Sequence, residues 1–223
     1  GAVNFAADVT FADGADIITA SAGTSNFRAG VNAGNSIESG GNYNVAIGDE
    51  AGTAITTGDN NVAVGYQALD ANTTGYSNTA LGVAALGTNV SGLGNTAVGA
   101  NALDISTANY GTAVGDNALG ANTSAGNGTA VGANALSANT TGGSNTAVGK
   151  NALTANTTGA QNTAMGLEAG KSITTGTYND FFGFRAGDLT TTASNNVGIG
   201  SNTLGANTTG ASNTAVGSNA LVA

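Results

Sequence analysis

The sequence has no cysteine, histidine, proline or tryptophan among its 223 residues. Without cysteine and histidine, the chain cannot form disulfide bonds, zinc sites with nitrogen or sulfur ligands, or catalytic triads based on imidazole. Charge is also scarce, since only 8% of the residues are charged and four lysines and arginines face 13 acidic residues. Four scattered cations cannot neutralise a phosphate backbone, so nucleic acid and anionic membranes are not expected as partners.

Long apolar runs are absent too. No run reaches 18 residues, so no helix is expected to insert into a membrane. The lack of cysteine fits an extracellular protein that needs no redox-dependent cross-link. No signal peptide is visible, and because the chain begins at Gly1 instead of methionine, we interpret it as a processed product or a fragment.

The abundant residue is glycine, at 37 positions, and much of it is periodic. One glycine closes a short apolar run in each repeat, with successive spacings of 18, 17, 17, 17, 16 and then 17 residues throughout. These glycines are Gly30, Gly48, Gly65, Gly82, Gly99, Gly115, Gly132, Gly149, Gly166, Gly183, Gly200 and Gly217. A repeat of this regularity predicts one elongated domain of stacked units over residues 26–223.

Each unit opens with a run such as Asn-Thr-Ala-Val-Gly at 95–99, which is too short and too rich in β-branched residues for a helix. Side chains alternate between the faces of a strand, so Thr96 and Val98 share one face and Ala97 takes the other. The position of Val98 is apolar in every unit from the second onward, and we therefore assign it to the interior. Its equivalents are Ile47, Val64, Leu81, Val114, Val131, Val148, Met165, Phe182, Ile199 and Val216.

The second half of each unit carries an alanine, as at Ala51 and Ala68, with Thr203 as the exception, and its small size suggests close packing. The next position is either leucine with a polar residue three places later, as in Leu69 and Asn72, or glycine with isoleucine three places later. One aliphatic group per unit is kept, so both positions are expected to face a shared core. Gly187 departs in part, because Leu189 follows one place early.

Each unit then ends in a Thr-Thr-Gly turn, as at 73–75, or a similar one, so a unit is expected to contain two short strands and two turns. The predicted fold is all-β, a parallel β-solenoid (β-roll) of about twelve 17-residue coils, spanning roughly 55–60 Å at ~4.8 Å per coil. One asparagine per unit would form a hydrogen-bonded amide ladder. Its members are Asn44, Asn61, Asn78, Asn95, Asn145, Asn162, Asn179, Asn196 and Asn213.

Residues 1–25 lie outside the repeat and contain short alternating runs at 3–5 and 9–11. Such a segment is expected to cap the open end of the solenoid, or to dock as a strand on a neighbouring subunit. In the docking alternative, residues 3–11 complete the last half coil of the next subunit. Deleting residues 1–12 is then expected to abolish end-to-end assembly.

The unit Asn-Thr-Ala-Val-Gly-x-Asn-Ala-Leu-x-Ala-Asn-Thr-Thr-Gly resembles the repeats of bacteriophage tail-fibre and appendage proteins over residues 26–223. More loosely, runs such as Val-Ala-Ile-Gly at 45–48 are similar to the left-handed β-roll heads of trimeric autotransporter adhesins. The resemblance implies an extracellular, cell-surface or virion appendage that assembles with copies of itself, as a trimer or an end-to-end polymer. A cell-surface glycan or receptor is a further possible partner.

Few residues are candidates for chemistry. The densest acidic group is Asp49 and Glu50 with Asp59, and Asp13 with Asp16 is another. We interpret both groups as solvated loop charges, with a chance Ca²⁺ at Asp49 or Asp59 left open. The units have almost no insertions to build a cleft, and aspartate does not recur once per unit as in calcium-binding β-rolls. We therefore expect no catalytic site, metal site or cofactor, and no enzymatic activity.

Two further features have open interpretations. Phe181, Phe182 and Phe184, near Tyr178 and Arg185, either fill the core locally or form a lateral contact or sugar-stacking patch. Glycosylation motifs arise from the repeat itself, with glycosylation as the alternative reading. They begin at Asn72, Asn89, Asn122, Asn127, Asn139, Asn156 and Asn207.

The expected function is structural: an extracellular fibre, filament or adhesive shaft that self-associates laterally or end to end. The alternative is a surface-recognition solenoid that binds ice or glycans. A threonine column is present, but we assign it to the inward face, and a flat threonine array for ice binding needs at least two outward columns. The column contains Thr79, Thr96, Thr112, Thr129, Thr146 and Thr163.

Overall fold

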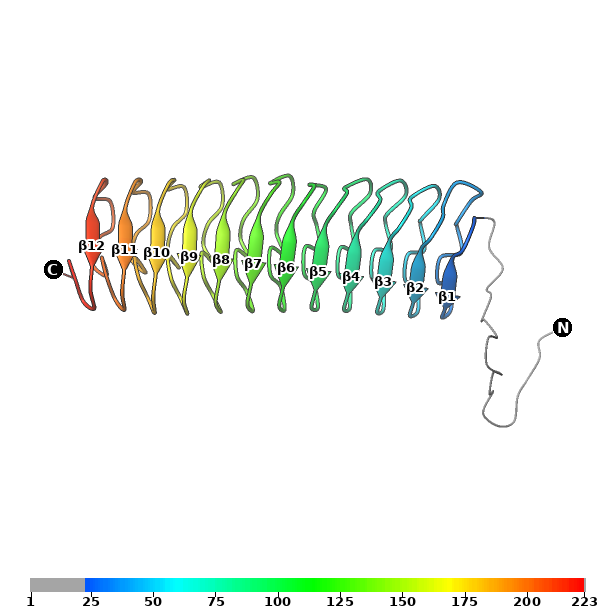
Figure 1. Cartoon of the computed structure of the whole chain (residues 1–223), viewed down its shortest axis with the longest axis horizontal. Coiled ribbons are helices and arrows are strands. Elements are labelled where there is room, and N and C mark those ends of the chain that lie inside the picture. Colours follow the sequence, from blue (N-terminus) through cyan, green and yellow to red (C-terminus); the bar gives the residue numbers. More distant parts are fainter. Residues whose placement is uncertain (1–22, 223) are drawn as a thin grey trace, which may run out of the picture.

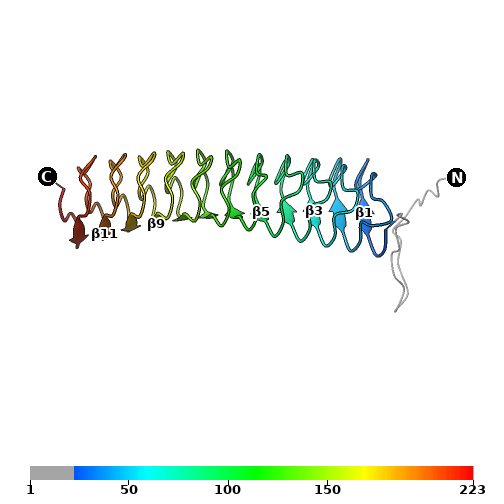
Figure 2. The ribbon, with the colours of Figure 1, turned by 90° about the horizontal axis from the view of Figure 1, so that it is seen from above.

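The computed structural model describes residues 23–222 as one long row of stacked coils, shown from two directions in Figures 1 and 2. Each coil contributes one three-residue strand, and the twelve strands pair in parallel, in chain order, in a single sheet. The predicted parallel β-solenoid is therefore confirmed. The strands are β1 (Phe27–Ala29), β2 (Val45–Ile47), β3 (Val62–Val64), β4 (Thr79–Leu81), β5 (Thr96–Val98), β6 (Thr112–Val114), β7 (Thr129–Val131), β8 (Thr146–Val148), β9 (Thr163–Met165), β10 (Asp180–Phe182), β11 (Val197–Ile199) and β12 (Thr214–Val216).

The strand register follows the repeat. Val98 pairs with Val114, and Val114 pairs with Val131, so equivalent residues occupy successive positions of one column. The 18-residue spacing keeps this register between β1 and β2, where Phe27 pairs with Val45. The 16-residue spacing does the same between β5 and β6. The extra and missing residues are thus absorbed by the turns, and the strands stay aligned.

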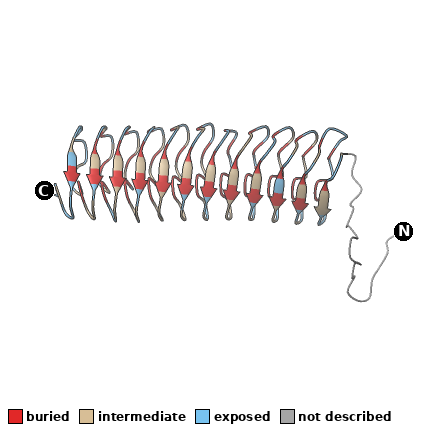
Figure 3. Ribbon diagram, in the orientation of Figure 1, coloured by how far each residue is buried: buried red, intermediate tan, exposed pale blue. Residues whose placement is uncertain are grey.

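The strands face the opposite way from the prediction. Ala97 is fully buried, as is its equivalent in almost every strand, whereas Val114 and Val131 are each 37% exposed and Leu81 is 47% exposed. The Val98 column exists but lies on the outer face, and the Thr96 column lies beside it. Figure 3 shows the buried section and the more exposed sections along each strand from β2 to β12. The prediction that these two columns face inward is wrong.

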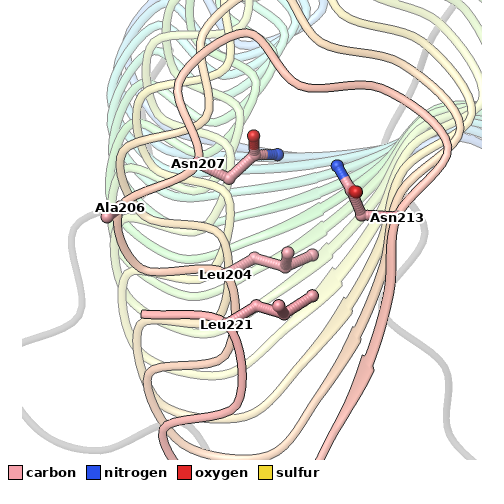
Figure 4. A pocket seen from close by; sticks show the side chains of 5 residues that line it. All are labelled: Leu204, Ala206, Asn207, Asn213 and Leu221. Carbon is pink, nitrogen blue, oxygen red and sulfur yellow. The ribbon is translucent and has the colours of Figure 1, made fainter. Parts of the chain in front are cut away.

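The thinness of the coil explains this orientation. The space behind the strand is already occupied by fully buried leucines from the opposite wall, such as Leu103 and Leu119. Figure 4 shows Leu204 and Leu221 one above the other, both pointing across the interior toward the strand side. Only an alanine-sized side chain fits between such a leucine and the strand. The larger and more variable aliphatic residues must therefore point outward.

The predicted exchange of leucine and isoleucine in a shared core is confirmed. Leu69 in one coil and Ile55 in the preceding coil are both fully buried, and the alanines before them, such as Ala51 and Ala68, are fully buried as well. Where glycine replaces leucine, the isoleucine reaches into the same space. A Cβ atom built on Gly52 would lie 2.8 Å from Cδ1 of Ile55.

The second strand expected in each coil does not form. In its place the chain makes consecutive turns, because alternate residues adopt the left-handed conformation: φ is +57° at Glu50 and +58° at Gly52. The amide of Ile55 donates to the carbonyl of Gly52 at 3.2 Å within this segment. Bonds between coils continue nonetheless, since the Gly52 amide donates to the Ala68 carbonyl at 2.9 Å. The left-handed residues rule out an extended strand but preserve the stacking.

The coil that contains β10 is packed differently. Phe181 replaces the usual strand alanine and is fully buried. Its ring occupies the space of the missing leucine, because a Cβ atom on Gly187 would lie 2.4 Å from Cε2 of Phe181. Gly198 in the next strand leaves room on the other side, where a Cβ atom would lie 3.0 Å from the ring. Leu189 consequently faces solvent, and Thr190 takes the core position.

The predicted asparagine ladder is confirmed, with an interruption. The Asn61 amide nitrogen Nδ2 donates to Oδ1 of Asn44 at 3.1 Å and to the carbonyl of Gly75 at 2.9 Å, so each side chain joins its own coil to its neighbour. Gly111 and Gly128 replace asparagine in two consecutive coils, where the ladder is broken. Threonines add a second connection between coils: Oγ1 of Thr140 donates to the Thr157 carbonyl at 3.0 Å.

A second buried asparagine ladder faces the first across the coil. Asn156 donates through Nδ2 to Oδ1 of Asn139 at 2.8 Å. The ladder ends where Ile173 follows, and Oδ1 of Asn156 is buried without a hydrogen-bond partner. Figure 4 shows Asn213, the last member of the first ladder, and Asn207, which holds the unit position of the second ladder beyond its end, pointing toward one another.

The expected cap, residues 1–25, lies almost wholly outside the described residues, as does the segment whose deletion was expected to abolish end-to-end assembly. The first described coil differs from the others at its strand. Arg28 occupies the position of the buried alanine, and its Nη1 donates to the carbonyl of Gly34 at 2.9 Å. The guanidinium therefore lies within the first coil and satisfies a turn carbonyl there.

Candidate interaction surfaces

The broadest uniform surface is the strand face, which we define as the first and third residues of β1–β12. Its third-position column is aliphatic or aromatic from Ile47 onward, and its first-position column is threonine or valine in most strands. Asp180 is the one charged residue among them. Met165 and Ile199 are 42% and 44% exposed, so the column presents apolar surface along the whole sheet.

The dimensions of the strand face follow from strand geometry. Twelve parallel strands ~4.8 Å apart extend over roughly 55 Å, and three residues span roughly 10 Å across. The face is therefore long, narrow and largely uncharged. Contiguous exposed apolar surface of several hundred Å² is uncommon on monomers and marks interaction sites.

The acidic candidates do not form a site. Asp49 is exposed, Glu50 accepts a hydrogen bond from Nε2 of Gln67 at 2.7 Å, and Asp59 accepts one from the amide of Asn42 at 2.7 Å. These carboxylates are used within and between turns. In residues 23–222, no three potential metal ligands of the histidine, cysteine or carboxylate type come together. Asp13 and Asp16 lie outside that range.

A different acidic pair was not found from the sequence. Burial raises the pKa of Asp104, and it is also the largest influence on Asp70, whose pKa is raised further by the charges of Glu50 and Asp104. The two aspartates occupy the same unit position two coils apart, with Gly87 between them. This recurrence of aspartate at one unit position was the signal in the sequence that could have identified the pair. Their partial burial and mutual repulsion make them a cost to stability.

The aromatic candidates separate onto different surfaces. Phe181 is a core residue, Phe182 belongs to the strand face, and Tyr178 is 54% exposed at a corner. Phe184 is exposed and lies 5.2 Å from Cζ of Arg185. The Arg185 Nε atom donates to Glu168 at 2.8 Å, and this bond is the main reason that the pKa of Glu168 is lowered. The expected cluster is therefore not one patch.

Most of the potential glycosylation sites are inaccessible in the folded chain. The asparagines at 72, 89, 122, 139 and 156 are buried members of the second ladder. Asn127 is exposed and Asn207 is partly exposed. The motifs at the buried positions therefore serve the core.

One pocket lies at the last described coil, lined by Leu204, Ala206, Asn207, Asn213 and Leu221 (Figure 4). Apart from Ala206, these residues hold the core leucine positions and the two asparagine positions of the unit. The pocket is thus a cross-section of the repeated core and has no chemistry of its own.

None of the residues from 23 to 222 forms a helix with the length and apolarity needed to cross a membrane. The chain was also compared with protein-family models, with curated proteins and with solved structures, and none of these comparisons finds a match. The function must therefore be inferred from the surfaces of the solenoid.

Proposed function

We propose that this chain is a structural subunit of an extracellular fibre, filament or adhesive shaft, and that it associates laterally with copies of itself through the strand face. The observation that carries the proposal is the outward orientation of the Val98 column. An apolar column of this length is costly to leave in water and is suited to pairing with another surface.

A second copy is the occupant that fits this face best. One apolar side chain protrudes every ~4.8 Å, a spacing that another β-solenoid with the same rise can match over its whole length. Charge repulsion is small because Asp180 is the single charge on the face. Its planar area is roughly 550 Å², and side-chain relief brings the accessible area toward the ~800 Å² per partner of a stable interface.

The construction of the coil supports a mechanical role. Strand pairing connects each coil to the next, and amide ladders and threonine hydroxyls add further bonds between most coils, so bending or stretching must break several bonds at once. The resemblance of the repeat to phage tail fibres and trimeric adhesin heads supports a surface appendage of this kind, with a trimer or a longer polymer as the assembled form. We propose no enzymatic activity, since the 17-residue unit provides no long loops to build a cleft.

The test is to place charge on the strand face. Replacing Val98, Val114 and Val131 together by lysine should shift the sedimentation of the protein from the assembled to the monomeric position, because the three side chains already point to solvent in the monomer. The matched control replaces Ala100, Ala133 and Ser201 by lysine, which adds the same charge at the unit position that Lys150 already occupies. A wild-type chain that sediments as a monomer at every concentration, or a lysine variant that assembles normally, contradicts the proposal.

Ice binding is a second candidate, because the structure overturns one argument against it, the expected inward orientation of the threonine column. The threonines from Thr79 to Thr163 lie on the outer face in six consecutive strands, next to the aliphatic column. One regular outward threonine column is thus present, beside the aliphatic column. Thermal hysteresis of the wild-type protein tests this candidate directly, and replacing Thr112 and Thr129 by lysine should abolish any activity found. Absence of hysteresis in the monomeric protein eliminates it.

A further inference from the structure

A second periodic surface runs along one corner of the solenoid. We define the corner column as the residues that lie two places before each strand. Every member has a positive φ, between 56° and 65°. Within this column tyrosine occurs before β2, β6 and β10, at Tyr43, Tyr110 and Tyr178. One coil later the position holds Asn60, Asn127 and Asn195, and two coils later it holds Ser77, Ser144 and Ser212.

The corner column therefore has its own period of four coils, superimposed on the 17-residue unit. At ~4.8 Å per coil the tyrosines are roughly 19 Å apart, and the outer two are separated by roughly 38 Å. The core positions do not share this period. Whatever the tyrosines contact must therefore lie outside the coil.

The fold does not require tyrosine at these positions. The backbone amide of Tyr43 donates to the carbonyl of Thr24 at 2.9 Å, and Asn60 makes the equivalent bond to Asn42 at 2.9 Å. Serine, asparagine, glycine and glutamine make the same turn elsewhere in the column. A positive φ is tolerated best by glycine and asparagine, so a bulky tyrosine is an unfavourable choice for the turn.

The rings are also available for binding. Tyr43, Tyr110 and Tyr178 are 59%, 60% and 54% exposed, and their hydroxyls make no hydrogen bond to any residue in the range 23–222. The Tyr110 ring lies over Gly94, where an added Cβ atom would be 2.8 Å from Cδ1 of the ring. One of the three rings is thus supported from below by the preceding coil.

The surroundings of the rings are polar but uncharged. The corner column contains only serine, asparagine, glycine, glutamine and tyrosine, and Asp59 is the single charge among the residues that directly precede it. Within the column the rings are separated by amides, hydroxyls and glycine, and the large apolar residues that directly precede it are Tyr76 and Leu93, so the column tyrosines do not form one apolar patch. Such an edge offers aromatic faces together with neutral hydrogen-bond donors and acceptors.

From this arrangement we propose that the corner column binds a neutral polysaccharide, which lies extended along the solenoid axis. Each tyrosine stacks against the apolar face of a sugar ring, and the neighbouring asparagines and serines bond to sugar hydroxyls. The absence of positive charge disfavours nucleic acid and anionic polymers. The isolation of the rings disfavours a protein partner, whose contacts concentrate in a desolvated apolar centre.

The spacing makes the site multivalent. A short oligosaccharide engages one tyrosine, whereas a chain longer than roughly 19 Å reaches two, and linked contacts can raise affinity by about 10²- to 10⁴-fold. Apparent affinity is therefore expected to rise steeply with ligand length. This inference does not depend on lateral association, because the corner column is separate from the strand face.

The test is affinity electrophoresis, for which the acidic chain, with a formal net charge of −9, is well suited. Native gels contain hydroxyethyl cellulose, glucomannan or dextran as neutral probes and alginate as an anionic one. The test variant replaces all three column tyrosines by serine, the residue that the column already has at Ser77 and Ser144. The control is Tyr66→Ser, an exposed tyrosine at a unit position where Ser201 and Ser218 occur.

We expect at least one neutral probe to retard the wild type and the control variant. The triple variant should lose about 10²-fold or more in apparent affinity, and each single variant about two- to tenfold. Retardation by alginate alone, by no probe, or equally for the triple variant overturns the inference. So does a triple variant that fails to assemble in sedimentation, since the tyrosines would then contact a second copy. Circular dichroism of the triple variant confirms that it folds.

Discussion

The exchange of leucine and isoleucine between coils gives a quantitative test of the core. We consider the coil that begins with β2, where Gly52 and Ile55 take the places of Leu69 and Asn72 in the next coil. Converting the glycine–isoleucine pair of this coil into the leucine–asparagine pair of the next requires Gly52→Leu and Ile55→Asn together. Because both side chains share one space, each change alone should be harmful and the pair should be tolerated.

The structure sets the magnitudes. Ile55 is fully buried, so Ile55→Asn alone leaves a cavity and should cost about 2–5 kcal/mol. Gly52→Leu alone places an atom 2.8 Å from Cδ1 of Ile55, and such overpacking costs about 1–3 kcal/mol. In the double variant leucine fills the cavity. The asparagine can bond to Asn72 as Asn72 does to Asn89, at 3.4 Å.

A leucine at position 52 must adopt a positive φ, which costs about 1–2 kcal/mol relative to glycine. Leu69 accepts this conformation, with φ of +55°. The double variant should therefore lie within about 2 kcal/mol of the wild type, with a favourable coupling of about 3 kcal/mol.

Native-state hydrogen exchange at the amides of β2 and β3 is the appropriate assay, because repeat arrays can unfold in parts. The control pair, Asp49→Ser and Thr57→Ser, changes two exposed positions of the same coil and should be additive. If the effects of Gly52→Leu and Ile55→Asn also add without coupling, the two residues do not share a core space and the reasoning is refuted.

Three other predictions concern single sites. Gly128→Asn should fill one of the two gaps in the ladder, the one next to Asn145, and raise stability by about 1 kcal/mol in thermal unfolding, since an added Cβ atom lies no closer than 3.4 Å to Leu119. Destabilisation would show that the site has no room. Phe181→Ala should cost about 3–5 kcal/mol in the same assay. Adding Gly187→Leu should recover part of this loss, because a leucine at position 187 would fill the space that the Phe181 ring occupies. If no stability is recovered, the two side chains do not share that space. Burial raises the pKa of Asp70, so the stability of the folded chain should fall as pH rises from below 3.8 through the folded-state pKa. Asp70→Asn should therefore raise the Tm at pH 7 but not at pH 3. The control, Asp116→Asn at an exposed position, should leave the Tm unchanged at both pH values.

Periodicity alone was sufficient to predict the solenoid, the asparagine ladder and the leucine–isoleucine exchange. Each of these depends on which residues recur, and stacking brings recurring residues together whatever their orientation. The packing of the Phe181 coil could be predicted in the same way, because the unit that has phenylalanine in place of the strand alanine also has glycine, at Gly187, in place of leucine.

The orientation of the strand could not be predicted from hydropathy. Val98 is more apolar than Ala97, and apolar residues are normally placed inside. The informative signal was size: the alanine position hardly varies, as expected for a tightly packed interior, whereas the valine position accepts leucine, methionine and phenylalanine. The missing second strand had no such signal. Leucine disfavours positive φ, and only the stacked coils impose it at positions such as Leu69.

The interruption at Gly111 and Gly128 has a consequence for how the chain finds its correct alignment. An array of identical coils can fold with one coil left out of the stack and lose little stability, since every coil can stack on every other. The coil between β5 and β6, which is one residue short, and the two rungs without an amide are poor substitutes for the rest. They distinguish the centre of the array from the other coils. A chain that stacks its coils out of register must therefore pair an irregular coil with a regular one, which is less stable than the correct alignment.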